Sequence, residues 1–172
     1  MKFKWSKGKI FLLLILGAFA IHFLFFRAPS EAQMIAKFHA NKAQFEQLRL
    51  MLAHDKNVKD IGPDWTNAKY KKMPDGVEMP QLPLNVSDKR FALYRARMKQ
   101  LGISMLLVDE RRDLVRFSVF GGGFTDTSWS IGYVYSKNIP NPLVKSAYYQ
   151  MPGREGIHFS RIEGNWYIYN RH

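Results

Sequence analysis

The sequence contains no cysteine. This absence excludes disulfide bridges, zinc–thiolate centres and a catalytic thiol, so any folded domain in the chain must hold together by packing. Small secreted eukaryotic domains commonly depend on disulfides. The lack of cysteine therefore favours a bacterial cell envelope as the setting of an exported domain of this size.

Acidic residues are missing from the start of the chain, where the charged residues are four lysines, Lys2, Lys4, Lys7 and Lys9. An uncharged run of 17 residues, 10–26, follows them. As a helix this run would measure about 25 Å, short of a hydrocarbon core of roughly 30 Å, but the flanking side chains of Lys9 and Arg27 can extend to the headgroups. The run therefore predicts a membrane-spanning helix.

The lysine excess on the N-terminal side sets the predicted topology. We expect a basic cytoplasmic tail over residues 1–9, a transmembrane anchor over 10–27 and a periplasmic or extracellular domain over 28–172, in the bacterial inner membrane. A cleaved signal peptide is the alternative, because residues 30–32 (Ser-Glu-Ala) offer small residues for a cut before Gln33. Against cleavage, the apolar run exceeds the usual signal-peptide core of about 7 to 15 residues.

The predicted domain is basic. Residues 28–172 contain 21 Lys and Arg residues and 14 Asp and Glu residues, a net charge of +7. This charge favours anionic partners. The expected partners are the membrane lipid bilayer and an envelope protein or another anionic envelope component. Nucleic acid is not an expected partner, because the predicted compartment holds little of it and no RNA-recognition motif is present.

Two helices are predicted at the start of the domain. Ser30 and Gln33 form a Ser-x-x-Gln capping box, and steps of three and four residues continue to about His54. The positions on this stripe are Met34, Phe38, Asn41, Phe45, Leu48 and Leu52, of which Asn41 alone is polar. The second helix runs from an N-cap at Ser87 to a C-cap at Gly102. Its apolar stripe is Phe91, Tyr94, Met98 and Leu101.

The remaining sequence predicts a loop and then a sheet. Residues 55–86 show no sustained period and contain four prolines, which predicts a loop laid over the core. Beyond Gly102 the apolar residues alternate with a period of two. About five strands are predicted over 103–110, 114–120, 127–136, 156–162 and 165–171. Helices followed by strands predict an α+β domain, with both helices on one face of a mainly antiparallel sheet.

No motif in the sequence indicates a particular reaction. The glycines 121–123 join two predicted strands and are not followed by the helix and lysine of a phosphate loop, so we interpret them as a hairpin tip. Asp109, Glu110 and Asp113 surround a predicted turn with two arginines, which indicates a salt-paired tip rather than a carboxylate pair for catalysis. The histidines fit no metal-ligand spacing. We therefore assign no catalytic residue, metal or cofactor.

The last two predicted strands give the candidate binding residues. A turn at Glu163-Gly164 would pair His158 with Tyr169 and Ser160 with Tyr167. This register directs Phe159, Trp166 and Ile168 to the core, and His158, Ser160, Tyr167 and Tyr169 to the opposite face. If helices cover only one face, the side chains of His158, Tyr167 and Tyr169 are exposed and suited to binding a partner. The alternative is that the loop over 137–156 covers them.

The sequence as a whole predicts a membrane-anchored envelope protein with a non-enzymatic binding or accessory domain. An exported small enzyme of unknown reaction and a cleaved, secreted binding protein are the alternatives. The identity of the partner does not follow from the sequence.

Overall fold

The computed structural model describes residues 28–68, 70–72, 78–80, 84, 86–110, 113–122, 129–148 and 156–171. The predicted cytoplasmic tail (1–9) and transmembrane anchor (10–27) lie outside these residues. Among the helices within the described ranges, none combines the length and the apolar character needed to cross a bilayer.

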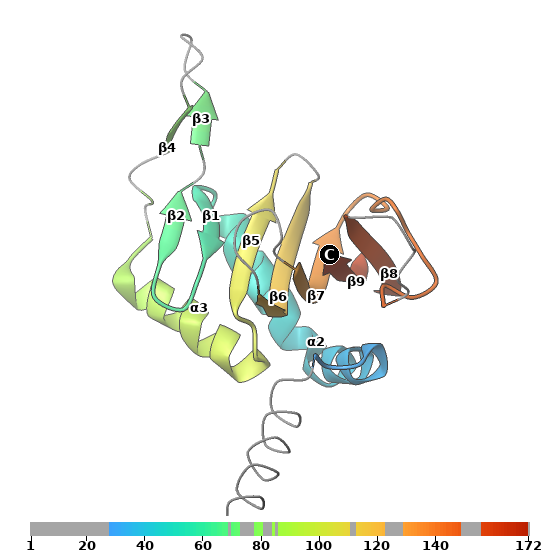
Figure 1. The fold of residues 1–172 in the computed structure, drawn as a ribbon. Helices are drawn as coiled ribbons and strands as arrows, with labels where there is room; N and C mark the ends of the chain where they lie inside the picture. Colours follow the sequence, from blue (N-terminus) through green and yellow to red (C-terminus); the bar gives the residue numbers. More distant parts are fainter. Residues whose placement is uncertain are drawn as a thin grey trace, which may run out of the picture.

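Seven antiparallel strands form the main sheet, in the order β2-β1-β5-β6-β7-β9-β8 (Figure 1). Their bounds are Val58–Ile61 (β1), Thr66–Ala68 (β2), Met105–Asp109 (β5), Leu114–Gly122 (β6), Trp129–Ser136 (β7), Ile157–Glu163 (β8) and Trp166–Arg171 (β9). The predicted α+β class is confirmed. The prediction of about five strands is wrong, because the sheet has seven.

The five predicted strands correspond to β5 to β9. The other two strands of the main sheet, β1 and β2, lie within 55–86, for which we predicted a loop. Strands β1 and β2 are only four and three residues long, and an irregularity between Val58 and Asp60 breaks the alternation that marks a longer strand. A separate two-stranded sheet follows, formed by β3 (Tyr70–Lys72) and β4 (Glu78–Pro80). Figure 1 shows this pair projecting away from the main sheet.

Helix α2 (Glu31–His54) begins at the predicted capping box. The Ser30 hydroxyl accepts from the Gln33 backbone N–H at 3.3 Å, and the Gln33 side chain accepts from the Ser30 N–H at 2.8 Å. The backbone leaves helical geometry at Asn41, whose side-chain amide donates to the Lys37 carbonyl at 2.9 Å. Figure 1 shows the two segments of α2 at an angle to each other. Asn41, the polar residue on the apolar stripe, is therefore the position at which α2 is kinked.

Helix α3 (Asp88–Leu101) has both predicted caps. The Ser87 hydroxyl accepts from the Arg90 backbone N–H at 3.2 Å. Gly102 ends the helix in the left-handed conformation, with φ +61°, which is the usual role of glycine at this position. The four residues of the predicted apolar stripe, Phe91, Tyr94, Met98 and Leu101, are buried.

Both helices contribute to a single hydrophobic core with the sheet. The ring of Phe45 on α2 lies 4.7 Å from that of Tyr133 on β7 and 5.9 Å from that of Trp166 on β9. The Tyr133 hydroxyl donates to the Met34 carbonyl at 2.9 Å, so the polar end of this buried ring is also bonded. These contacts fix α2 across the central strands.

Truncation of Met98 tests the predicted packing of α3. Met98 is 3% exposed and belongs to the main core. Met98→Ala should lower the free energy of unfolding by about 2 to 5 kcal/mol, because it removes buried side-chain volume and leaves a cavity. Denaturant unfolding measures the change. The matched control is Lys99→Ala on the exposed side of the same helix, and equal stability of the two variants would contradict the packing.

Candidate functional site

The predicted binding residues His158, Tyr167 and Tyr169 lie on the β8–β9 hairpin, and its register differs from the predicted one. Glu163 pairs with Trp166, so the turn is Gly164-Asn165 rather than Glu163-Gly164. Gly164 adopts φ +52°, which glycine accepts without steric cost. The register also shifts between Arg161 and Glu163, which leaves one extra residue in β8.

This difference moves the residues of β8 to the opposite faces from those predicted. Phe159, predicted in the main core, pairs with Tyr169 and joins a second buried cluster on the far face of the sheet. That cluster also contains Leu114, Val134 and Tyr167. Ser160, predicted on the far face, donates instead to Glu31 of α2, and His158 pairs with Asn170. The residues of β9 keep their predicted faces, since Trp166 and Ile168 lie in the main core.

The three candidate residues are buried, so the condition under which they would be exposed does not hold. The exposed fractions are 3% for His158, 1% for Tyr167 and 0% for Tyr169. The Tyr169 and Ser118 hydroxyls lie 2.7 Å apart in a hydrogen bond, and Arg161 donates to the Tyr167 hydroxyl at 3.2 Å. A binding role for these residues stays a prediction, but the exposure on which it depended is not met.

Part of the loop over 137–156 does reach this hairpin. The backbone N–H of Val144 donates to the Phe159 carbonyl at 2.7 Å, and the Phe159 N–H donates to the Pro142 carbonyl at 3.1 Å. Leu143 forms a parallel bridge with Phe159. This segment therefore lies along the outer edge of β8.

The buried tyrosines are expected to stabilise the fold. Tyr167→Ala and Tyr169→Ala should each cost roughly 3 to 5 kcal/mol, as for other buried aromatic truncations, and the double variant should be largely unfolded. Tyr169→Phe is the control, because it keeps the ring and loses only the bond to Ser118, at a cost of about 1 kcal/mol. Circular dichroism with denaturant unfolding measures these changes, and a folded, stable double variant would show that the far face is not core.

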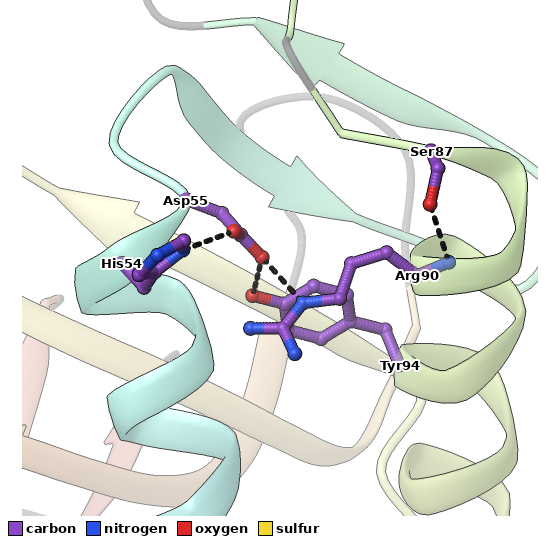
Figure 2. Close-up of polar contacts among 5 residues, drawn as sticks. All are labelled: His54, Asp55, Ser87, Arg90 and Tyr94. Carbon is purple, nitrogen blue, oxygen red and sulfur yellow. Dashed lines mark hydrogen bonds and ion pairs between the residues drawn. The ribbon is translucent and has the colours of Figure 1, made fainter.

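A buried carboxylate connects the two helices (Figure 2). Asp55 follows the last residue of α2, and one of its oxygens accepts from the Tyr94 hydroxyl at 2.7 Å and from Arg90 Nε at 2.9 Å. Its second oxygen lies 3.0 Å from His54 Nδ1. The Asp55 side chain is 7% exposed, and both Arg90 and Tyr94 belong to α3. We call these three residues, Asp55, Arg90 and Tyr94, the Asp55 brace.

The brace shifts the pKa values of its members away from neutral pH. Burial opposes ionisation of Asp55, but hydrogen bonds with His54, Tyr94 and Arg90 outweigh it and lower the pKa of the carboxyl. Burial, followed by the hydrogen bond to Asp55, raises the pKa of Tyr94. The hydrogen bond to Asp55 raises the pKa of Arg90. At neutral pH the Asp55 carboxylate and the Arg90 guanidinium therefore stay charged, and the Tyr94 hydroxyl keeps its proton.

Asp55→Asn tests the brace. The carboxyl pKa is lowered in the folded state, so the charge of Asp55 stabilises the fold above its unfolded pKa of about 3.9, and this contribution is lost as the pH falls through the folded pKa. The variant should lose about 2 kcal/mol at neutral pH, and the deficit relative to wild type should shrink in acid.

Urea unfolding at pH values between 7 and 3 measures this difference. Asp64→Asn, at an exposed acid in the β1–β2 turn, is the control and should change stability by less than about 0.5 kcal/mol. A pH-independent deficit for Asp55→Asn would contradict the charged brace.

The outer surface next to the brace is a groove between α2 and α3, with a volume of about 310 Å³. Two leucines line it although they lie outside the apolar stripes of their helices: Leu50 is 55% exposed and Leu93 is 40% exposed. The complete lining is Gln47, Leu50, Met51, His54, Arg90, Leu93 and Arg97. We call this surface the α2–α3 groove. Sequence reasoning missed it, although a leucine on the polar side of each helix was a signal for it.

A second hollow, of about 350 Å³, lies where the end of α2 meets the β5–β6 turn. Its lining carries charges of both signs: Arg49, Lys56 and Lys137 are basic, and Asp109, Glu110 and Asp113 are acidic. The Arg49 guanidinium lies 4.4 Å from the ring centre of Tyr135 and bonds to Glu46 at 2.7 Å. Arg116 lies 3.7 Å from Asp109. The two arginines of the predicted salt-paired tip, at positions 111 and 112, lie outside the described residues. This balance of charge does not select a ligand class.

Within the described part of the chain, no group of three or more His, Asp or Glu side chains is placed to hold a metal ion. The α2–α3 groove, with its two exposed leucines, is the candidate site.

Comparison with known proteins gives no match to a protein-family model, to a curated protein or to a solved structure.

Proposed function

We propose that this protein is a single-pass inner-membrane protein whose extracytoplasmic domain binds another component of the cell envelope and catalyses no reaction. The anchoring rests on the lysines before the 17-residue apolar run. The binding rests on one observation: Leu50 and Leu93, two exposed apolar side chains, line the same groove, which also contains two arginines.

The contacts of residues 29–31 support retention of the predicted anchor. The Tyr148 hydroxyl donates to the Pro29 carbonyl, and the hydroxyls of Ser146 and Ser160 donate to the Glu31 carboxylate. Ser30 caps α2. A cut before Gln33 would remove Pro29, Ser30 and Glu31. It would leave three hydroxyl groups without their partners and the first turn of α2 uncapped, so the packing favours an uncleaved chain.

The electrostatics of the Asp55 brace support binding over catalysis. A general acid or base works best with a pKa near the operating pH. The pKa of Asp55 is lowered and that of Tyr94 is raised, so both groups move away from neutrality. The brace is suited to holding α2 and α3 in place, which keeps the two sides of the groove in a fixed relation.

Exposed leucines on a rigid surface are suited to protein recognition. Binding energy at protein interfaces concentrates in a few apolar or arginine side chains surrounded by weaker contacts. Leu50 and Leu93 provide the apolar groups, and Arg90 and Arg97 border them. At about 310 Å³ the groove is at the lower limit of small-ligand pockets, which suits inserted side chains better than a whole cofactor.

Fractionation and site-specific photo-crosslinking of the full-length protein in bacterial cells test the proposal. The protein should sediment with membranes, resist carbonate extraction and give an active C-terminal periplasmic reporter. A photoreactive residue at Leu93 should capture a protein, whereas one at Ile139, which is 66% exposed on the loop after β7, should not. A soluble product beginning at Gln33, or equal capture at both positions, would contradict the proposal.

A further inference from the structure

The α2–α3 groove has the geometry of a seat for a third helix. Its lining residues on α2 are Gln47, Leu50, Met51 and His54, at positions i, i+3, i+4 and i+7, and those on α3 are Arg90, Leu93 and Arg97, at i, i+3 and i+7. Rows at this spacing form the ridges between which the side chains of another helix pack. An amphipathic helix binds such a groove through apolar residues at the same spacing.

The charge of the groove selects among such helices. Its lining contains two arginines and a histidine, and no acidic side chain. Arg90 is bonded to Asp55 through Nε, and Figure 2 shows its two terminal nitrogens directed away from that bond. Arg97 spans the groove, since its guanidinium donates to the side chain of Gln47. Both guanidinium groups are therefore held beside the exposed leucines.

We propose that the α2–α3 groove binds an acidic amphipathic helix of an envelope protein. This inference rests on the proposed function and names the chemistry of its partner. Apolar side chains of the helix contact Leu50 and Leu93, and its carboxylates pair with Arg90 and Arg97. Arginine is suited to this role because its planar group binds carboxylates in a bidentate manner.

Other occupants fit the groove less well. A second copy of the chain, docked through the same face, would bring Arg90 and Arg97 of both copies close together without an acidic residue between them. A peptide that binds by strand addition needs the unpaired backbone groups of a sheet edge, which two helices do not offer. A bilayer presents a broad surface rather than side chains that enter a hollow between helices.

Photo-crosslinking in cells, with mass spectrometry of the adduct, tests the inference on the full-length protein. The photoreactive residue is placed at Leu50 or at Leu93, and the captured peptide is sequenced. Both positions should capture one protein segment, with apolar residues at steps of three and four and an excess of Asp and Glu. Arg97→Glu should reduce capture at Leu93 at least tenfold, because like charges would then face each other.

Two further variants serve as controls. Lys99→Glu makes the same charge change on the exposed side of α3 outside the groove, and capture should stay within twofold of the parent. Arg97→Gln removes the charge, keeps hydrogen-bonding capacity toward Gln47, and should reduce capture by an intermediate factor. Equal losses for Lys99→Glu and Arg97→Glu would show a general effect of charge and would overturn the inference.

The nature of the adduct separates failure of the inference from failure of the proposed function. A captured protein segment that is basic, or that lacks the helical spacing, overturns the inference and leaves the proposed binding function standing. A second copy of the chain as the adduct overturns both, because the proposed function requires a different component of the envelope. A lipid adduct overturns the inference but leaves binding of an envelope component standing, whereas no adduct at either leucine overturns both.

Discussion

The carboxylate of Asp55 is the interaction on which the arrangement of the helices depends. Its backbone N–H donates to the Met51 carbonyl at 3.0 Å and ends α2, and its own carbonyl accepts from Val58 at 3.0 Å where β1 begins. Its side chain reaches α3 through Arg90 and Tyr94. One residue therefore connects two helices and the start of the sheet. A buried carboxylate without such donors would be costly, so the three groups stabilise the fold only together.

The α2–α3 groove follows from this connection. The aromatic contacts of Phe45 fix α2 on the sheet, and the buried stripe of α3 fixes the second helix beside it. With both helices fixed, the residues between them form a surface of constant shape. Arg90 belongs to the brace and to the groove at the same time, which couples the rigidity of the domain to the charge of its proposed binding surface.

Local signals predicted most of the helices and strands. The capping box at Ser30, the cap at Ser87 and the glycine at Gly102 each act within one helical turn, and all three occur in the structure. Strands β1 and β2 were missed because three or four residues with an irregular register show no period. Strand β1 is held in place by pairing with β5, and β2 by pairing with β1. The β8–β9 turn was misplaced by one residue, because Glu163-Gly164 and Gly164-Asn165 both suit a turn.

The candidate site was less predictable than the fold. The partners of Asp55 lie 35 and 39 residues away in the sequence, so no spacing rule connects them. The groove requires two helices to be placed beside each other, which depends on the sheet beneath them. A kink at Asn41 was indicated by a polar residue on the apolar stripe. Exposed leucines such as Leu93 were indicated equally clearly, since they lie on the polar side of a helix.

The two edges of the main sheet differ in how they are protected from pairing with other chains. Strand β8 is seven residues long, and an edge of that length is a template for intermolecular strand addition. The backbone of Pro142 and Val144 bonds to both polar groups of Phe159 and occupies the middle of this edge. Strand β2, at the other edge, has only three residues, too few to hold an added strand by itself. The segment beside β8 thus blocks the pairing of another strand with this edge. Loosening it would expose backbone groups to which a strand of another chain could add.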